Sequence, residues 1–373
     1  MKKLFFATVF VLFCLNMTFG QVYTNKVVGK KNVAFIDSLK AKPYPYSLPI
    51  WGAKAAAKGY DLPYSAGIGM NYLWQQSDLI INDLFVGFNN GPMYNLDEII
   101  RFTGAVATAS AVNFRPDIWV LPFLNVYALL AKAKTSTEIN AGVWIPDETN
   151  TWNEVTSFSS KANFDATSFG IGMTPTLGVG GGWMALDMNM TWTDVSALNK
   201  PVFTFVFGPR FGKTFKLKRP ESNFAFWVGG FRLNLSSVTE GSILLSEVLP
   251  IDGLQTKVDN GITKVADTQV QVDEWWNGLS SSAQRNPTNI AKHETADRVL
   301  QTTGNVLNEI DGALNDEQQA TVQYSLTKRP KDMWNFVIGS QYQFSKHFML
   351  RAEYGFMGSR QQFIGGLQYR FGL

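Results

Sequence analysis

The last forty residues alternate between apolar side chains and polar or small ones. In the run from Trp334 to Phe344, large apolar residues occupy every second position except Ser340, and Asn, Gly and Gln occupy most positions between them. The pattern restarts at Phe348 and again at Phe363, and it continues to the end of the chain. Side chains of a strand point to opposite faces with period two. These residues therefore predict three strands, each with one apolar and one polar face.

Seven earlier runs show the same period. They cover residues 65–74, 113–121, 126–134, 165–173, 183–193, 201–213 and 223–235. A soluble sandwich would alternate in the same way. Lipid on the apolar side is favoured by strands of about ten residues, by the many aromatic residues and by glycines and charges on the opposite face. The 32 glycines and the 14% aromatic content fit this interpretation.

The pattern predicts an all-β membrane protein, an antiparallel transmembrane β-barrel of about ten strands. An even number is expected for such a barrel. Twelve strands are possible if residues 79–110 supply two more, although the segment 75–111 could instead extend the flanking strands as a hairpin. Short turns at Pro122, Thr174, Lys216 and Lys346 would lie at one end. The long segments 75–111, 146–162 and 236–332 would lie at the other, outer end.

The period changes between about Ser236 and Asp332, where alternation almost disappears. Residues 265–278 and 283–315 are predicted to be helical, and the second helix has one apolar stripe with a spacing of three to four residues. The stripe consists of Ala296, Val299, Thr303, Val306, Ile310 and Leu314. It needs an apolar partner. The insertion therefore either enters the barrel as a plug or packs outside as a cap, before the last three strands.

The first twenty residues have the layout of a secretory signal peptide. Lys2 and Lys3 precede an apolar run that ends at Leu15, and cleavage is expected after Gly20. Cys14, the only cysteine, lies in this run, so disulfides, thiol catalysis and cysteine-bound metals are not expected in the mature chain. The expected organisation is a signal peptide (1–20), an N-terminal periplasmic segment (21–64), strands one to seven (65–235), the insertion (236–332) and strands eight to ten (333–373).

Two stretches carry a resemblance to known proteins. The first is the Trp-Val-Leu-Pro-Phe-Leu-Asn-Val-Tyr segment from Trp119 to Tyr127. The second is the closing region, with Glu353-Tyr-Gly-Phe356 and Tyr369-Arg-Phe371. Together they resemble an uncharacterised family of Gram-negative outer-membrane β-barrel proteins, most clearly over about 110–135 and 324–373. The resemblance implies location in the cell outer membrane, contact with its lipid and assembly by the barrel-insertion machinery. That machinery recognises the aromatic-rich final strand, which often ends in phenylalanine, whereas this chain ends in Leu373. The resemblance implies no catalytic residues.

Eight charged residues fall on faces predicted to line the lumen. They are Arg115, Asp117, Asp187, Arg210, Arg232, Arg351, Glu353 and Arg370. Charges in a membrane protein face its interior and usually pair. They could form a salt-bridge network that holds the barrel rigid, or an eyelet that selects small solutes. Five arginines against three acids would slightly favour anions.

Catalysis and metal binding are not expected from the two histidines. His347 lies in a predicted turn near Ser345, and His293 lies in the predicted helical insertion. Their separation argues against a histidine-based metal site, and short turns commonly contain serine and histidine without a catalytic role. A pair of aspartates acting as acid and base is not excluded. No cofactor is expected, and removing Lys2 and Lys3 lowers the net charge from +3 to +1, which does not suggest nucleic-acid binding.

Three functions follow from this architecture. The first is a narrow, porin-like channel or transporter for small solutes, capped by the helical insertion. The second is a barrel that anchors a surface-exposed helical module for binding a partner. The third is an outer-membrane hydrolase, which the shortage of histidines disfavours. The sequence does not identify the solute.

Overall fold

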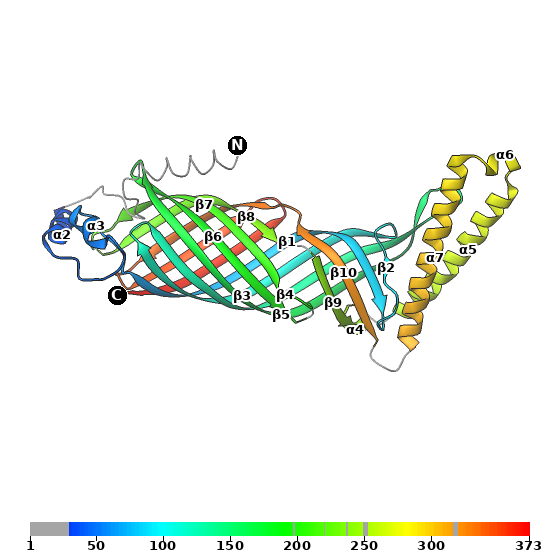
Figure 1. Ribbon diagram of the computed structural model, residues 1–373, viewed down its shortest axis with the longest axis horizontal. Helices are drawn as coiled ribbons and strands as arrows, with labels where there is room; N and C mark the ends of the chain where they lie inside the picture. The colour runs from blue at the N-terminus through cyan, green and yellow to red at the C-terminus, as the bar shows by residue number, and fades with distance from the viewer. Residues whose placement is uncertain (1–29, 197, 220, 236–237, 249–252, 316–319) are drawn as a thin grey trace.

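A computed structural model describes residues 30–373 except 197, 220, 236–237, 249–252 and 316–319. The signal peptide, its Cys14 and the segment up to residue 29 lie outside the described residues. Ten antiparallel strands close into a barrel in the order β13-β12-β11-β8-β7-β6-β5-β4-β3-β1, and β1 pairs with β13. This confirms the predicted ten-stranded antiparallel barrel (Figure 1).

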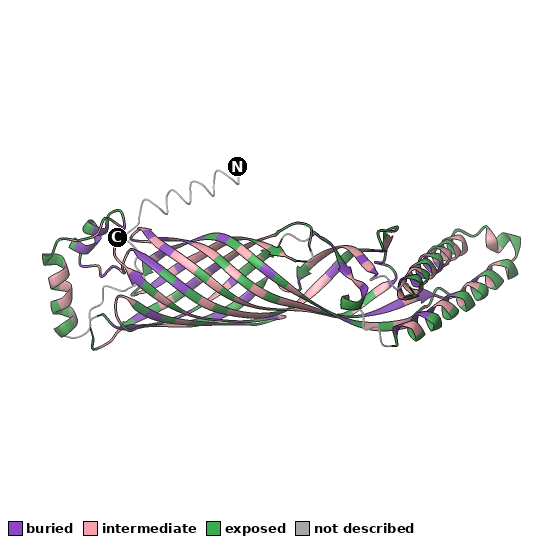
Figure 2. Ribbon diagram, turned by 90° about the horizontal axis from the view of Figure 1, so that it is seen from below, coloured by how far each residue is buried: buried purple, intermediate pink, exposed green. Residues whose placement is uncertain are grey.

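The barrel strands correspond one to one with the ten alternating runs. Their bounds are β1 Ala66–Phe88, β3 Ile100–Leu121, β4 Leu124–Pro146, β5 Trp152–Val179, β6 Gly182–Val195, β7 Val202–Lys216, β8 Asn223–Leu235, β11 Trp334–Gln343, β12 Phe348–Phe356 and β13 Arg360–Phe371. At one end of the barrel, here called the turn end, short connections join β3 to β4, β5 to β6, β7 to β8 and β11 to β12. The opposite end carries the long segments and is called the extended end. Burial alternates along the barrel strands, as the colours in Figure 2 show.

An apolar belt surrounds the outside of the barrel. On β5 the outward positions from Phe169 to Val179 are apolar, whereas Asp165 and Thr167, on the same face toward the extended end, are polar and exposed. On β4 the outer face changes in the same way between Leu130 and Lys132. The belt on β5 therefore spans about eleven residues, the length of strand that crosses a bilayer.

Four strands continue well beyond the belt. β1, β3, β4 and β5 have 23, 22, 23 and 28 residues, about twice the length needed to cross a membrane. Residues 79–110 therefore extend β1 and β3 and do not add two barrel strands. The predicted loop at 146–162 is also wrong, because only 147–151 connect β4 to β5. The turn predicted from Thr174 to Gly182 is confined to Gly180–Gly181, where both glycines have positive φ, and β5 continues to Val179.

The insertion is not wholly helical. It begins with β9 (Val238–Leu244) and ends with β10 (Thr321–Pro330), two strands that pair with each other. β10 also pairs with the outer part of β1, which pairs with the short β2 (Tyr94–Asn95). These three strands lie beyond the closed barrel. They form, with the long strands, a stalk between the barrel and the helices (Figure 1).

The helices between β9 and β10 form a long hairpin. α4 (Leu245–Val248) is followed by α5 (Leu254–Gly278), the single turn α6 (Ser281–Gln284) and α7 (Pro287–Asn315). α5 and α7 face each other with apolar residues at alternating spacings of three and four, the pattern of a coiled coil. The positions are Leu254, Val258, Gly261, Val265 and Val272 on α5, and Ala296, Leu300, Thr303, Leu307, Ile310 and Leu314 on α7.

The predicted apolar stripe is buried within this hairpin and against the stalk. Ala296, Val299 and Thr303 are almost fully buried, and Val306, Ile310 and Leu314 are partly buried. At the base of the hairpin, the helices pack on Leu96, Ile99, Val143 and Ile145 of the stalk. The hairpin therefore lies at the far end of the stalk and not inside the barrel (Figure 1).

The N-terminal segment lies at the turn end. It contains α2 (Lys30–Ala41) and α3 (Gly52–Ala57). Its backbone bonds to the barrel through Leu48 to Leu373 and through Ile50 to Val120. Asp61 forms ion pairs with Lys216 and Lys346, which flank two of the turns. Within the described ranges, no helix is both long and apolar enough to cross a membrane.

Candidate functional site

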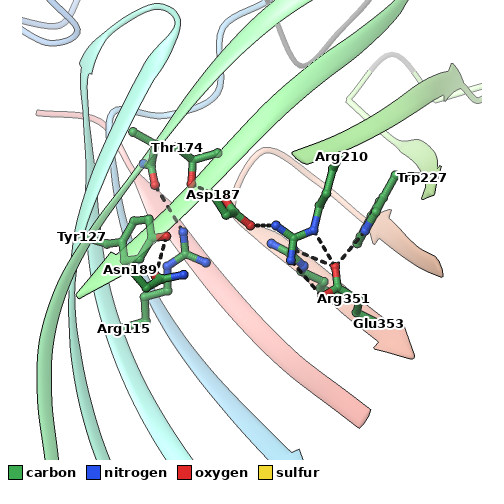
Figure 3. Close-up of polar contacts among 10 residues, drawn as sticks. Arg115, Tyr127, Thr174, Asp187, Asn189, Arg210, Trp227, Arg351 and Glu353 are labelled. Carbon is green, nitrogen blue, oxygen red and sulfur yellow. Dashed lines mark hydrogen bonds and ion pairs between the residues drawn. The ribbon is translucent and has the colours of Figure 1, made fainter. Parts of the chain in front are cut away.

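Seven of the eight predicted lumen residues do point into the barrel. They come from β3, β6, β7, β12 and β13. Figure 3 shows five of them, Arg115, Asp187, Arg210, Arg351 and Glu353. Arg210, Glu353, Asp117 and Arg370 are 9%, 2%, 6% and 5% exposed. Such low exposure inside a barrel means that side chains, not water, fill the space around them. We describe the residues as two clusters that differ in their distance from the turn end.

The central cluster consists of Asp187, Arg210, Trp227, Arg351 and Glu353. Arg210 donates two hydrogen bonds to Glu353, from Nε to Oε2 (2.7 Å) and from Nη2 to Oε1 (2.8 Å). Its third nitrogen, Nη1, forms an ion pair with Asp187. Bidentate pairing of this kind is the strongest arrangement between a guanidinium and a carboxylate. Because β7 and β12 are separated by β8 and β11, the pair bridges the lumen.

Two further donors complete the coordination of Glu353. Trp227 Nε1 donates to Oε2 at 2.9 Å, and Arg351 Nη2 approaches the same oxygen at 3.4 Å. The Arg351 guanidinium also lies 4.9 Å from the centre of the Trp227 ring, within the range of a cation–π contact. Burying a carboxylate is costly unless it is paired and hydrogen-bonded. Glu353 meets both conditions, so it is stable as an anion in the barrel interior.

Gly339 allows Trp227 to lie flat against the wall. The two residues are directly opposite each other on β8 and β11, and a Cβ at position 339 would overlap the indole ring. Trp183 and Gly212 repeat the arrangement on β6 and β7. Small residues beside inward tryptophans thus create the space in which the central cluster is assembled.

The lower cluster, closer to the turn end, consists of Asp117, Asn125, Gln368 and Arg370. Asp117 pairs with Arg370 and accepts hydrogen bonds from Gln368 and from Asn125, the last at 2.7 Å. Arg370 Nη1 donates to the carbonyl of Tyr64 at 2.7 Å, which connects this cluster to the N-terminal segment. Asp117 and Arg370 lie on β3 and β13, the two neighbours of β1, so this cluster covers the inner wall at Gly67 of β1 and does not cross the lumen.

Arg115 lies between the two clusters without a carboxylate partner in the structure. Its guanidinium stacks on the Tyr127 ring at 3.7 Å, and the Tyr127 hydroxyl donates to Asn189 at 2.8 Å. Its contact with Asn125 is long, at 3.5 Å. A cation–π contact is an effective partner for a desolvated arginine. Among the seven inward residues of the predicted set, Arg115 is thus the one that the clusters do not neutralise by an ion pair.

Arg232 was predicted to face the lumen, and this is wrong. β8 alternates without interruption, so Arg232 shares the outer face with Phe224, Phe226 and Val228, and it is exposed. It lies between Trp334 and Phe207 on the outer face, near the extended end of β8, where a long charged side chain can reach water. Among the eight predicted charges, four arginines and three acids therefore point inward, and the arginine excess in this set falls from two to one.

The sequence analysis missed several uncharged residues that belong to the two clusters or contact Asp187 and Arg115 beside them. They are Asn125, Tyr127, Thr174, Asn189, Trp227 and Gln368. Thr174 was placed in a turn, but it lies within β5 and donates its hydroxyl to Asp187. A search of every inward position for hydrogen-bonding groups would have found these residues, whereas a search for charges could not.

Arg360 closes the barrel interior near the extended end. It is 0% exposed, its guanidinium lies 5.5 Å from the Phe231 ring, and Nη2 donates to the carbonyl of Asp332 at 3.1 Å. The sequence does not show that Arg360 points inward, because it is the first residue of β13 and no earlier residue of the strand establishes the alternation.

The serine and histidine of the β11–β12 turn stabilise the turn. Ser345 Oγ accepts from the backbone N–H groups of His347 and Phe348 at 3.3 and 3.4 Å. The His347 ring nitrogen Nδ1 is 2.8 Å from the carbonyl oxygen of Arg370, and the ring stacks between Tyr64 and Tyr369. Neither contact joins the serine hydroxyl to the imidazole ring.

Comparison with known proteins finds similarity at the level of structure only. No family model and no curated protein sequence matches the chain. Among solved structures, the β-domain of the Bordetella autotransporter BrkA matches with 8% identity and a TM-score of 0.34, over 82% of this chain and 100% of that chain. The translocator domain of the autotransporter NalP from Neisseria meningitidis matches with 10% identity and a TM-score of 0.31, over 85% and 92%. An outer-membrane channel from Pseudomonas putida matches with 9% identity and a TM-score of 0.26, over 83% and 96%.

Proposed function

We propose that this protein is an outer-membrane anchor whose barrel, closed by side chains, holds a helical hairpin away from the cell surface on a β-stranded stalk. The observation that carries the proposal is the bridging of the lumen by the Arg210–Glu353 pair, with the buried Arg370–Asp117 pair on the inner wall nearer the turn end. A ten-stranded barrel is only slightly wider than the eight-stranded barrels that side chains just fill. The buried Arg210–Glu353 bridge, with the lower cluster on the wall beside it, is therefore enough to close it.

The stalk and hairpin support the second part of the proposal. α5 and α7 have 25 and 29 residues, so at about 1.5 Å per residue the hairpin is roughly 40 Å long. Its apolar stripe is buried between the two helices and at the base, which leaves the outer faces free for a partner.

Short turns on the periplasmic side and long segments outside are the rule for these barrels. The hairpin would accordingly face the exterior, after export by the signal peptide and insertion by the barrel machinery into outer-membrane lipid. In this role the chain needs no catalytic residue and no nucleic-acid partner.

Cysteine labelling on intact cells tests the orientation. In a Cys14→Ala background, one variant carries Ser281→Cys at the exposed tip of the hairpin, and another carries Ala34→Cys in the exposed part of α2. A membrane-impermeant maleimide should label the first variant on intact cells and the second only after permeabilisation. The reverse pattern, or fractionation of the protein away from the outer membrane, would overturn the proposal.

A solute channel is the second candidate, and Arg115 favours it. This arginine has a guanidinium in the lumen without a carboxylate partner in the structure, as expected of a site that attracts anions. Conductance in planar bilayers separates the two functions. The anchor predicts no steady conductance for the purified protein, and an Arg210→Ala/Glu353→Ala double variant should open a path. Steady, anion-selective conductance of the unaltered protein that is lost in Arg115→Gln would establish the channel instead.

A further inference from the structure

The two helices of the hairpin are connected by a polar bridge that occurs twice. Near the base, Gln255 Nε2 donates to Asp259 on the same helix (2.9 Å) and to Asp311 on α7 (2.5 Å). Near the tip, Gln269 Nε2 donates to Asp273 (3.0 Å) and to Asp297 (2.9 Å). The two bridges are fourteen residues apart on each helix, which is two heptads.

A histidine distinguishes the tip bridge from the base bridge. The residue four positions before Asp311 is Leu307, which packs in the apolar core. The residue four positions before Asp297 is His293, and its Nδ1 is 3.5 Å from Asp297 Oδ2. Residues four apart lie on the same face of a helix. The tip therefore combines one imidazole and two carboxylates, whereas the base has the carboxylates alone.

The side chains at the tip lie close enough to bind a common ion. Single donor atoms of Asp273, His293 and Asp297 all lie within 4.8 Å of one another. Bond lengths of about 2.0–2.2 Å to zinc place donor atoms roughly 3.3–3.5 Å apart in a tetrahedral site. The His293–Asp297 distance already has this value. The exposed Asp273 needs to move by only about 1 Å to complete a three-ligand site, with water as the fourth ligand.

A neighbouring ring orients the imidazole. The ring of Trp276 stacks on His293 with a centroid distance of 4.3 Å and an angle of 19°. This contact limits rotation of the imidazole and leaves Nδ1 directed at Asp297. The carboxylates of Asp273 and Asp297 share the amide of Gln269, which supplies hydrogen bonds but no charge. A divalent cation between them would supply both charge and coordination.

We propose that Asp273, His293 and Asp297 form a binding site for a divalent transition metal that clamps α5 to α7 at the tip. Imidazole selects metals such as zinc, copper, nickel or cobalt over magnesium and calcium, which prefer oxygen ligands alone. The separation of the two histidines in the sequence argued against a histidine-based metal site. The fold shows that one histidine is sufficient, because the hairpin brings an aspartate of α5 to the histidine and aspartate of α7. The inference concerns the hairpin alone and holds whether the barrel anchors or conducts.

Titration of the full-length protein without a histidine tag tests the site. Isothermal titration with ZnCl₂ should give one site per chain. CoCl₂ should give visible absorption bands that ZnCl₂ abolishes. His293→Gln and the isosteric Asp273→Asn should each weaken zinc binding by roughly ten- to hundredfold. Loss of a residue that only supports a metal ligand has an effect of this size, so loss of a ligand should have at least as large an effect. Asp273→Asn keeps an acceptor for Gln269, so the helical circular dichroism should not change.

The base bridge supplies the matched control. Asp259→Asn removes the equivalent charge two heptads away, where no histidine is present, and should leave zinc affinity and stoichiometry unchanged. The proposal is overturned if the unaltered protein takes up no zinc or cobalt. It is also overturned if His293→Gln binds as tightly as the unaltered protein, or if Asp259→Asn weakens binding as much as Asp273→Asn does.

Discussion

At the scale of single residues, the barrel interior is determined by pairing. Glu353 is 2% exposed, yet three groups neutralise it or donate to it, namely Arg210, Trp227 and Arg351. A buried ion pair adds little net stability compared with apolar residues of the same shape, but removing one partner is expensive. The cluster is therefore sensitive to single truncations even though it does not itself drive folding.

Glu353→Ala should destabilise the barrel strongly. It leaves Arg210 with only Asp187 and leaves Arg351 without a carboxylate, and breaking a buried pair costs about 3–5 kcal/mol. Urea unfolding in detergent micelles, followed by tryptophan fluorescence and by heat-modifiable gel mobility, measures the loss. Arg232→Gln is the control, because this exposed residue on the outer face of β8 should change the free energy of unfolding by less than about 0.5 kcal/mol. Equal effects of the two substitutions would contradict the assignment of faces on β8.

Gly339→Ala should disturb the same cluster through packing. The new Cβ would overlap the Trp227 ring and displace the donor to Glu353, and overpacking of this kind costs about 1–3 kcal/mol. Gly69→Ala is the matched control on another inward strand position, where the nearest atom, the carbonyl oxygen of Arg115, is 3.5 Å from the new Cβ. The same unfolding assay applies. A neutral Gly339→Ala would show that Trp227 adapts without cost.

The sequence predicts inward charges well where a strand alternates clearly, and less well elsewhere. Asp187 and Arg210 lie in clean runs and were assigned correctly. Arg232 was assigned to the lumen because charges were assumed to avoid the outer face, and this assumption fails near the extended end of β8. The partners of each charge could not be predicted, because Glu353 and Arg210 are 143 residues apart and their contact depends on the closure of the barrel.

At the scale of elements, the outer parts of β1, β3, β4 and β5 were the least predictable. Between Lys132 and Asn140 the outer face of β4 is polar, so the alternation of apolar and polar residues that identifies a membrane strand is lost. The strands continue because neighbouring backbones still pair and because the helical hairpin covers Val143 and Ile145. Helical periodicity identified α7. The seven-residue β9 and the ten-residue β10 were missed beside the two long helices, although β10 is as long as β11.

Removing the hairpin should leave a closed barrel with an unprotected stalk. The N–H of Leu245 bonds to the carbonyl of Ala320, so residues 246–319 can be replaced by an Asn-Gly turn. The ten-stranded ladder is complete without the hairpin, and heat-modifiable mobility should persist. Ile145, Val143, Leu96 and Ile99 would become exposed, and we expect aggregation of the purified protein, measured by light scattering.

A shorter deletion serves as the control for that experiment. Replacing residues 266–302 by a flexible linker keeps the base of both helices over the stalk, including Val258 and Leu307. This variant should remain monodisperse. Loss of heat-modifiable mobility in both variants would instead make the helices part of the barrel's folding core.

At the scale of the whole molecule, the position of the membrane follows from the apolar belt. On β5 the belt runs from Phe169 to Val179, and its centre lies near Met173, which is 42% exposed on the outer face. Figure 1 shows the barrel, the stalk and the hairpin in sequence along the long axis of the molecule. The belt covers the barrel only, so the stalk and the hairpin lie in water. This arrangement predicts that one substitution has very different effects at two positions on the same strand face.

Met173→Lys should impair insertion, whereas Thr167→Lys should not. A lysine at the bilayer midplane of a barrel costs about 2–4 kcal/mol, and the cost falls to about 0–1 kcal/mol near the interface. Both side chains point outward and are exposed on β5, six residues apart, so local strand propensity and backbone pairing are nearly the same. The free energy of folding into vesicles of a phosphatidylcholine, measured by urea titration, should fall by the full midplane cost for Met173→Lys alone. Equal losses at the two positions would contradict this placement, because they would put the extended strands inside the membrane as well. The polar outer residues Lys132, Lys134 and Asp165 argue against such a taller apolar wall.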